Sequence, residues 1–209
     1  MSTDAQVTVA AVATGRGDGR QRILAAATEL FVTHGYAATT TRDIAGKAGI
    51  KQPSIYKHFA DKSEILIEVL SQSVRPSLAR YDELAADADL SASQRLAQLV
   101  QFEIRMLWQA PWNVALLSYL PDVATGNVAL TLKTQYAELR GIYGALVSDA
   151  LAEAGRDPGN ADALTDVVIT LVEGVILRRE LGPRIDGEQL ARDATNAVVA
   201  MVAGPRRRR

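Results

Sequence analysis

The sequence predicts an all-α protein of about nine helices, in which a short N-terminal three-helix unit with a helix-turn-helix precedes a larger C-terminal helical unit. Apolar residues recur at helical spacing through most of the 209 residues. Strand-like alternation is limited to one stretch near the N-terminus, Val7–Val12. The apolar fraction of 48% and the length suit a chain that buries a core in one large or two small domains.

The first two helices are delimited by glycines and by one good N-cap. Helical spacing of apolar residues predicts a helix over Gly19–His34, and Gly35 should end it. A second, short helix should begin at the N-cap Thr40, with Asp43 as its capping-box partner, and should break at Gly49.

Two further helices follow closely. The third should begin near Gln52, with Pro53 in the first turn, where the missing N–H has no cost. Asp61 should cap the fourth helix, with Glu64 closing a second capping box. We expect Pro76 to kink or end that helix.

The rest of the chain should form five more helices. The first should run from Ser91, capped with Gln94, to about Trp108, and the second from Pro111 to Leu120. The third should begin at the cap Asn127 and extend over Val128–Ala154, interrupted by Gly141 and Gly144. The fourth should run from Asn160 or Asp162 to about Arg179, and the fifth from Asp186 to Val202.

The net charge of −1 conceals a division along the chain. Residues 1–62 carry +3, residues 63–205 carry −8, and Arg206–Arg209 add +4. A basic head on an acidic body suits a head that faces a polyanion. We therefore divide the chain into a disordered leader (1–17), a helix-turn-helix domain (18–62), a regulatory and dimerisation domain (63–204) and a basic tail (205–209).

Several classes of function are disfavoured by composition. The chain has no cysteine and only two histidines, so thiolate sites, His-rich metal sites and Cys nucleophiles are excluded, and we expect no bound metal and no cofactor. Gly-rich phosphate loops and Ser-His-acid spacings expected of common enzymes are missing, so an enzyme is not predicted. No apolar run is long enough for a membrane span, and the start does not resemble a secretory signal, which favours a cytoplasmic protein without a membrane partner.

Residues 40–62 carry the strongest functional pattern. A helix, a tight turn and a second short helix form a pair in which the first helix braces the second and the second projects outward. The exposed side chains of this second helix are all hydrogen-bonding groups: Lys51, Gln52, Ser54, Lys57 and His58. The two lysines among them are fixed cations. Such groups suit base edges and phosphates rather than chemistry on a substrate.

About a quarter of the chain, from Arg20 to Leu70, resembles the DNA-binding domain of the TetR family. The resemblance is carried by Phe31-x-x-x-Gly35-Tyr36, Thr39-Thr40, Ile44-Ala45, Ala48-Gly49-Ile50, Ile55-Tyr56-x-His58-Phe59, Lys62 and Leu66. One departure is Lys51, which stands where many members have Ser or Thr and cannot cap the recognition helix; it could reach a phosphate, or Pro53 could suffice to start the helix.

The resemblance implies roles for individual residues. Thr40, at a helix N-terminus, would bind a backbone phosphate, as would Tyr56, His58 and Lys62 beside the groove. Candidates for base reading are Gln52, Ser54 and Lys57, while Arg42 and Lys51 could do either. Pro53, between two of these residues, completes the predicted DNA-binding set of ten. Alternatively, Tyr56 serves packing and His58 is a surface residue without a contact.

A helix-turn-helix usually acts as a two-fold dimer on a palindromic site. The predicted helix at 161–179 is apolar nearly all round and needs cover on every side. The resemblance implies that the last two helices of each chain form a four-helix interface. Its candidate residues are Leu164, Val168, Leu171, Val172, Val175, Leu190, Ala194, Ala197, Val198 and Met201, and the alternative is a core helix of a monomer.

The resemblance also implies a small-molecule cavity in the middle helices, whose occupancy moves the fourth helix and the head. Bulky, partly polar side chains concentrate there and suit an aromatic or lipophilic ligand. The candidates are Phe102, Met106, Trp108, Trp112, Tyr119, Tyr136 and Tyr143, with Glu173 as a buried polar contact, and each could equally be core or surface.

The sequence therefore predicts a dimeric transcriptional repressor that binds a double-stranded DNA operator and is released by an unidentified small-molecule effector. The alternative is a DNA-binding architectural or partner-recruiting protein that senses no small molecule.

Overall fold

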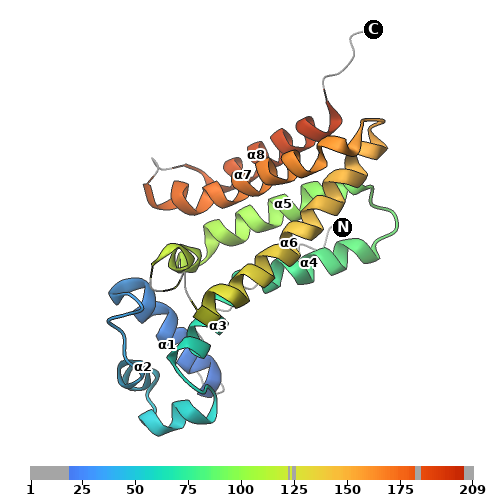
Figure 1. Cartoon of the computed structure of the whole chain (residues 1–209). Helices are drawn as coiled ribbons and strands as arrows, with labels where there is room; N and C mark the ends of the chain where they lie inside the picture. The colour runs from blue at the N-terminus through green and yellow to red at the C-terminus, as the bar shows by residue number, and fades with distance from the viewer. Residues whose placement is uncertain (1–18, 122, 124–125, 182–184, 205–209) are drawn as a thin grey trace, which may run out of the picture.

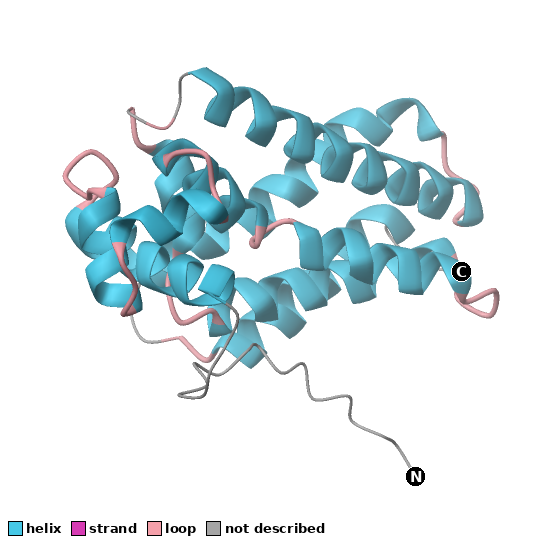
Figure 2. Cartoon of the chain, turned by 90° about the horizontal axis from the view of Figure 1, so that it is seen from below, coloured by secondary structure: helices cyan, strands magenta, loops and turns pink. Residues whose placement is uncertain are grey.

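The structure is a computed structural model that describes residues 19–121, 123, 126–181 and 185–204. Within them lie eight α-helices and three short 3-10 helices, and no strand. Figure 2 shows this all-helical architecture. The α-helices are α1 (Gly19–His34), α2 (Thr41–Ala48), α3 (Lys62–Ser71), α4 (Arg75–Ala86), α5 (Ala92–Gln109), α6 (Gly126–Glu153), α7 (Ala161–Leu181) and α8 (Gly187–Ala203). The 3-10 helices are η1 (Gln52–Lys57), η2 (Val114–Tyr119) and η3 (Pro158–Asn160). The predicted all-α class is confirmed.

Buried side chains gather in two clusters, which divide the molecule into a head and a body. The head, formed by α1, α2, η1 and α3, lies at one end of the molecule (Figure 1). Its core also receives Leu117 from η2 and Val128 and Leu132 from α6. The body core is formed by α4–α8, with α5 packed against α6, α7 and α8. Because α6 contributes to both clusters, it joins the head to the body.

Several predicted caps are confirmed by hydrogen bonds. Thr40 and Asp43 form a complete capping box at α2, and Ser91 does the same with Gln94 at α5. Asp61 caps α3 through the backbone N–H of Glu64. The Glu64 carboxylate instead accepts from the backbone N–H of Ala60, at 2.5 Å, so the second predicted box closes one residue earlier.

The glycines and remaining caps of the head and α8 also agree with prediction. Gly35 follows α1 with a φ of 85°, and Gly49 ends α2 with a φ of 66°, values that few L side chains adopt. Lys51 stands at the N-cap of η1 without a side-chain cap bond, and Pro53 occupies its first turn. Asp186 caps α8.

The prediction that Pro76 ends or kinks the fourth helix was wrong. The helix ends earlier, at Ser71, and Pro76 lies in the first turn of α4, which we did not predict. A proline fits there because the first turn has no partner for its missing N–H.

Two predictions about α6 were also wrong. The helix begins at Gly126, so Asn127 lies inside it rather than capping it. Gly141 and Gly144 do not interrupt it, since a glycine costs a helix only about 1 kcal/mol. A Cβ at Gly144 would lie 3.9 Å from Thr165 Oγ1, so this glycine sits where α6 and α7 pack.

None of the described helices is long and apolar enough to span a bilayer. The predicted leader (1–17) and tail (205–209) lie outside the described residues. The predicted boundary after Lys62 stays a prediction; it falls inside the first turn of α3, which packs in the head core.

Candidate nucleic-acid interface and effector cavity

The head core holds the helix-turn-helix rigidly. Phe31 of α1, Ile44 of α2 and Ile55 of η1 are completely buried together. The hydroxyl of Thr39, also buried, donates to the carbonyl of Gly35 at 2.8 Å and fixes the connection between α1 and α2. The outward-facing residues of η1 are therefore mounted on a well-packed base.

Seven of the ten predicted DNA-contact residues are exposed and three are partly buried. The exposed ones are Thr40, Arg42, Lys51, Pro53, Tyr56, Lys57 and His58, and the partly buried ones are Gln52, Ser54 and Lys62. They belong to the start of α2, to η1 and to the start of α3, which follow one another in the chain; α2 packs against η1, and Lys62 bonds to the loop before α2. The head thus brings all ten onto neighbouring elements. The second helix of the motif is 3-10 rather than α in form.

A hydrogen-bond chain joins α2 to η1 and uses a residue that we did not predict, Thr41. The amide Nε2 of Gln52 donates to Thr41 Oγ1 at 3.0 Å, and the same hydroxyl lies 3.3 Å from the hydroxyl of Tyr56. Thr41 therefore holds one candidate base-reading residue and one candidate phosphate-binding residue. Its position directly after the cap Thr40 was the signal that could have identified it.

Thr40 is engaged with Asp43 in two directions. Its hydroxyl donates to Asp43 Oδ2 at 2.6 Å, and its oxygen accepts from the backbone N–H of Asp43 at 3.2 Å. The side-chain and backbone hydrogen bonds from Thr40 lower the pKa of the Asp43 carboxyl. The N-terminus of α2 thus already carries the carboxylate of Asp43, and a DNA phosphate that binds there would lie beside this negative charge.

Lys62 lies against the loop between α1 and α2. Its Nζ donates to the carbonyls of Tyr36 and Thr39, at 2.8 and 2.9 Å, and lies 4.2 Å from the centre of the Tyr36 ring. In this arrangement Lys62, which we predicted to bind a DNA phosphate, holds the start of α3 against the loop.

His58 packs against the first residue of α1. Its Nε2 lies 3.0 Å from the position that a Cβ would take at Gly19. A side chain at Gly19 would therefore displace the imidazole from the edge of the candidate surface.

The body contains a cavity of about 50 Å³. Its lining comes from the α3–α4 connection and from α5, η2, α6 and α7: Ser73, Val74, Glu103, Met106, Leu107, Ala115, Tyr136, Leu139, Arg140, Tyr143, Ile169, Val172, Glu173 and Ile176. The lining is mostly apolar with a few polar groups, as in small-molecule sites, although such sites are typically at least about 300 Å³.

The structure places four of the eight predicted ligand residues at this cavity: Met106, Tyr136, Tyr143 and Glu173. The other four, Phe102, Trp108, Trp112 and Tyr119, are not among its lining residues. Trp108 packs against Gly187 of α8, where a Cβ would lie 2.1 Å from the indole Cδ1. Tyr119 is 61% exposed.

Glu103 is the principal residue that the sequence reasoning missed at this cavity. Its side chain is only 4% exposed, and it accepts a hydrogen bond from the hydroxyl of Tyr143 at 2.5 Å. Burial raises the pKa of its carboxyl. The nearby Ser77 hydroxyl acts in the opposite direction and lowers the pKa of Glu103, although its oxygen makes no hydrogen bond of good geometry with a described residue. An acid between Leu99 and Ile104 on an apolar helix face was a signal of the same kind as the one noted for Glu173.

A second acidic residue, Glu173 of α7, lines the same cavity. Burial raises the pKa of its carboxyl as well. Its negative charge contributes to raising the pKa values of Glu103 and Tyr136. The described residues contain no group of three potential metal ligands.

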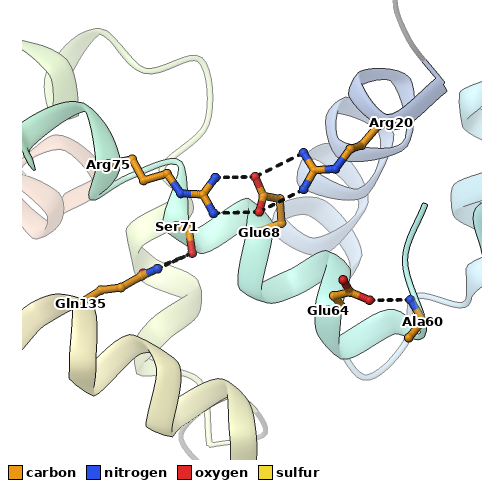
Figure 3. A network of polar contacts seen from close by, with 7 residues as sticks. All are labelled: Arg20, Ala60, Glu64, Glu68, Ser71, Arg75 and Gln135. Atoms are coloured by element: carbon orange, nitrogen blue, oxygen red, sulfur yellow. Dashed lines mark hydrogen bonds and ion pairs between the residues drawn. The ribbon is translucent and has the colours of Figure 1, made fainter. Parts of the chain in front are cut away.

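Charged side chains connect the head with the start of α4 (Figure 3). Glu68 of α3 accepts from both Nη atoms of Arg75, at 2.6 and 2.9 Å, and pairs with Arg20 of α1 at 3.1 Å. Hydrogen bonds from Arg75, and then from Arg20, lower the pKa of the Glu68 carboxyl to about 2. On α3, Ser71 also bonds with Gln135 of α6. Arg75 directly follows Val74 in the cavity wall, so the cavity and the head share one short segment.

The predicted interface residues divide by burial. Five lie buried within the chain's own structure: Val168, Val172, Val175, Ala194 and Val198. Four are partly buried, Leu164, Leu171, Leu190 and Met201, and Ala197 is exposed. On α7, the apolar residues Val167 and Leu177 are 48% and 55% exposed, although they were not among the candidates.

Comparison with known proteins agrees with this arrangement. The family model of the bacterial regulatory proteins of the tetR family matches residues 23–69. The crystal structure of Mycobacterium smegmatis AmtR is similar with 33% identity and a TM-score of 0.75, over 91% of this chain and 88% of that one.

Two curated relatives match the head region. The transcriptional repressor KstR2 of Mycobacterium tuberculosis is 39% identical over 80 residues, which are 38% of this chain and 40% of that protein. The transcriptional activator FasR of Mycolicibacterium smegmatis is 41% identical over 59 residues, 28% of this chain and 27% of that protein. The chain thus matches less than half the length of these curated relatives. Taken with the likeness to AmtR along nearly the whole chain, the fold and the head motif show that this chain belongs to the TetR family of bacterial regulatory proteins.

Proposed function

We propose that the protein is a homodimeric transcriptional repressor that binds a palindromic DNA operator and is released by a small aromatic or lipophilic ligand. The observation that carries this proposal is the set of polar and cationic side chains exposed on η1 and its flanks, on a head whose core is complete. The matched relatives include a repressor, KstR2, and an activator, FasR, so the sign of regulation is itself part of the proposal. A protein that acts on DNA would work in the cytoplasm.

In this proposal Gln52, Ser54 and Lys57 read bases. A glutamine can pair with adenine and a lysine can donate to guanine. Thr41 would keep the Gln52 amide in a defined orientation before DNA binds. Pro53 fixes the first turn of η1.

Backbone contacts would come from the flanks of η1. Thr40, Tyr56 and His58 would bind phosphates, while Arg42 and Lys51 could serve either task. Lys62 would act on DNA only after releasing the carbonyls of Tyr36 and Thr39; otherwise its part is to hold the loop.

A dimer would place two heads about 34 Å apart, on successive major grooves. We assign the interface to the outer faces of α7 and α8, which lie side by side (Figure 1). Exposed Val167 and Leu177 on α7 and Ala197 on α8 would lie at its contact surface. The five buried candidates would support these helices from within. Sedimentation at micromolar concentration tests this: a dimer is expected, and a monomer contradicts it.

The effector would act through the α3–α4 connection. Ser73 and Val74 line the cavity, and Arg75 next to them binds Glu68, which in turn binds Arg20 of the head. A ligand that enlarges the cavity would displace this connection and shift α1 and α3 relative to the body.

The alternative, a DNA-binding architectural or partner-recruiting protein without an effector, is favoured by one observation: the cavity holds only about 50 Å³. A broad thermal-shift screen of small molecules separates the two. Hits that also weaken operator binding support the repressor, and a screen without hits supports the alternative.

DNA recognition is tested by selecting bound sequences from a randomised duplex pool and measuring affinity for the selected site. Gln52→Ala with Lys57→Ala should weaken binding at least tenfold, because each good base contact is worth about 1–3 kcal/mol. The matched control is Gln109→Ala with Lys133→Ala, on exposed positions of α5 and α6, outside the proposed interface, which should bind like wild type. Equal affinity of the head variant and wild type would refute the assignment.

A further inference from the structure

Two glutamates line the cavity in the body, and most of the other lining residues are apolar. Glu103 reaches it from α5 and Glu173 from α7. Glu103 is more than nine-tenths buried, and Glu173 is partly buried. Two acidic residues from separate helices therefore line one partly open cavity.

Neither carboxyl group has a cationic partner in the part of the chain that the structure describes. Glu103 is bonded to the neutral hydroxyl of Tyr143, and no ion pair among the described residues includes Glu103 or Glu173. Arg140 is the one basic residue of the lining, and it is engaged outward with Asp166 at 2.9 Å and Asp162 at 3.7 Å.

Such an arrangement is unfavourable for the empty protein. Burying a carboxylate without a paired charge is costly, and the two acids also repel each other when both are ionised. The raised pKa values of both carboxyl groups express this cost. Ionisable groups with perturbed pKa values in a cleft often mark binding sites.

We propose that this cavity binds a cation: a protonated amine or amidine on a small apolar body, with its charged nitrogen between Glu103 and Glu173. The inference rests on the proposed function, because it names the class of effector for the proposed effector site. A ligand that carries a carboxylate or phosphate is disfavoured, because the two carboxyl groups would repel its negative charge.

The remaining lining suits such a molecule. Tyr136 and Tyr143 present aromatic rings, which attract cations, and Leu107, Leu139 and Ile169 supply apolar surface. Met106, a flexible side chain, lines the cavity and can move to admit the apolar part. This enlargement is needed because about 50 Å³ holds an ammonium group but not a whole aromatic amine.

The test is calorimetric titration of the full chain at neutral pH with three probes of similar shape: benzylamine, benzyl alcohol and phenylacetate. The amine should bind at least tenfold more tightly than the alcohol, and phenylacetate should bind most weakly. The proposal is overturned if the alcohol or phenylacetate binds as tightly as benzylamine, or if none of the three binds.

Variants locate the binding site. Glu173→Gln and Glu103→Gln should each weaken benzylamine binding about tenfold or more. The control Glu138→Gln alters an exposed carboxylate on α6 that is not part of the lining and should leave the affinity unchanged. Glu173 is only partly buried, so its variant tests the site independently of any change in folding stability at Glu103. Unchanged affinity in Glu173→Gln overturns the proposal.

Operator binding without ligand separates this inference from the proposed function. Selective DNA binding with no preference for benzylamine would refute the cationic class alone. Benzylamine binding that depends on Glu173, in a protein that selects no DNA sequence, would refute the proposed regulator and leave the cation site standing.

Discussion

Glu68 in the head and Glu103 in the body are both glutamates on helices that face a core, yet their surroundings are opposite. Glu68 accepts hydrogen bonds from two arginines, which lower the pKa of its carboxyl to about 2. Glu103 is buried with a tyrosine hydroxyl and a second acid nearby, and burial raises the pKa of its carboxyl. The first carboxyl is satisfied by the chain itself, whereas the second has no cation until something else supplies one.

The comparison teaches that similar residues are used for different purposes in the two regions. In the head–body connection, ionised groups stabilise one arrangement of α1, α3 and α4. In the cavity, the chain keeps a charge-bearing group at the expense of stability, which is typical of sites that act on ligands rather than of structural contacts. Neutralising Glu68 should therefore lower the stability of the fold, whereas neutralising Glu103 should raise it.

The largest effect is expected from Glu68→Gln. Loss of the paired charge should lower the free energy of unfolding at neutral pH by about 2 kcal/mol, because two arginines lose their partner while the amide remains largely buried. Urea unfolding measures this. Glu83→Gln is the control, since Glu83 is 66% exposed in its ion pair with Arg80 and should change stability by less than about 0.5 kcal/mol.

Acid should remove the same contribution. The pKa of Glu68 lies near 2 in the folded chain, below its ordinary value of 4.5, so its stabilisation is present above pH 4.5 and is lost as the pH falls towards 2. Wild type and Glu68→Gln should therefore converge in stability across this interval. A constant difference between them would contradict the ionic explanation.

An opposite and smaller effect is expected from Glu103→Gln. The amide keeps an acceptor for Tyr143 and removes the buried charge, so the variant should be more stable than wild type at neutral pH by about 1 kcal/mol. Because the folded pKa of Glu103 is raised above its ordinary value of 4.5, this advantage should shrink as the pH falls and should vanish below 4.5, where the carboxyl becomes neutral in both states. Lower stability of the variant at pH 7 would break the comparison.

The smallest effect concerns Arg75→Met. Arg75 is 55% exposed, so the variant should lose only about 0.5 kcal/mol of stability. Its sharper signature is the pKa of Glu68, which should rise towards 4.5, because Arg75 is the main cause of its depression. Nuclear magnetic resonance titration of the glutamate carboxyl carbons measures this pKa, and an unchanged value would show that Arg20 alone sustains it.

Local signals in the sequence were sufficient for many of the helix ends in both the head and the body. Caps such as Thr40, Ser91 and Asp186 and the ends at Gly35 and Gly49 depend on a few adjacent residues, and all are found as expected. Pro76 misled us because a proline ends one helix or begins another, and only the packing of α4 against α5 decides between them.

The site in the body was less predictable because burial there depends on packing between distant segments. The role of the apolar helix α7 as an interface stays a prediction: Val168 and Val172 lie buried in the chain's own core, whereas Val167 and Leu177 are exposed. Periodicity alone does not distinguish these faces when nearly every position is apolar. Glu103 was missed although it lies on an apolar helix face as Glu173 does, because that pattern does not identify the segments that bury the carboxyl.

The contacts of Lys62 affect how the head can move. Its ammonium group ties the start of α3 to the loop after α1, so displacement of α3 carries α1, α2 and η1 as one rigid body. In a dimer of the proposed kind, an effector would then alter the distance and tilt between the two reading surfaces and leave each surface itself unaltered. A released repressor of this design would still recognise an isolated half-site, and induction would act on the geometry of the pair.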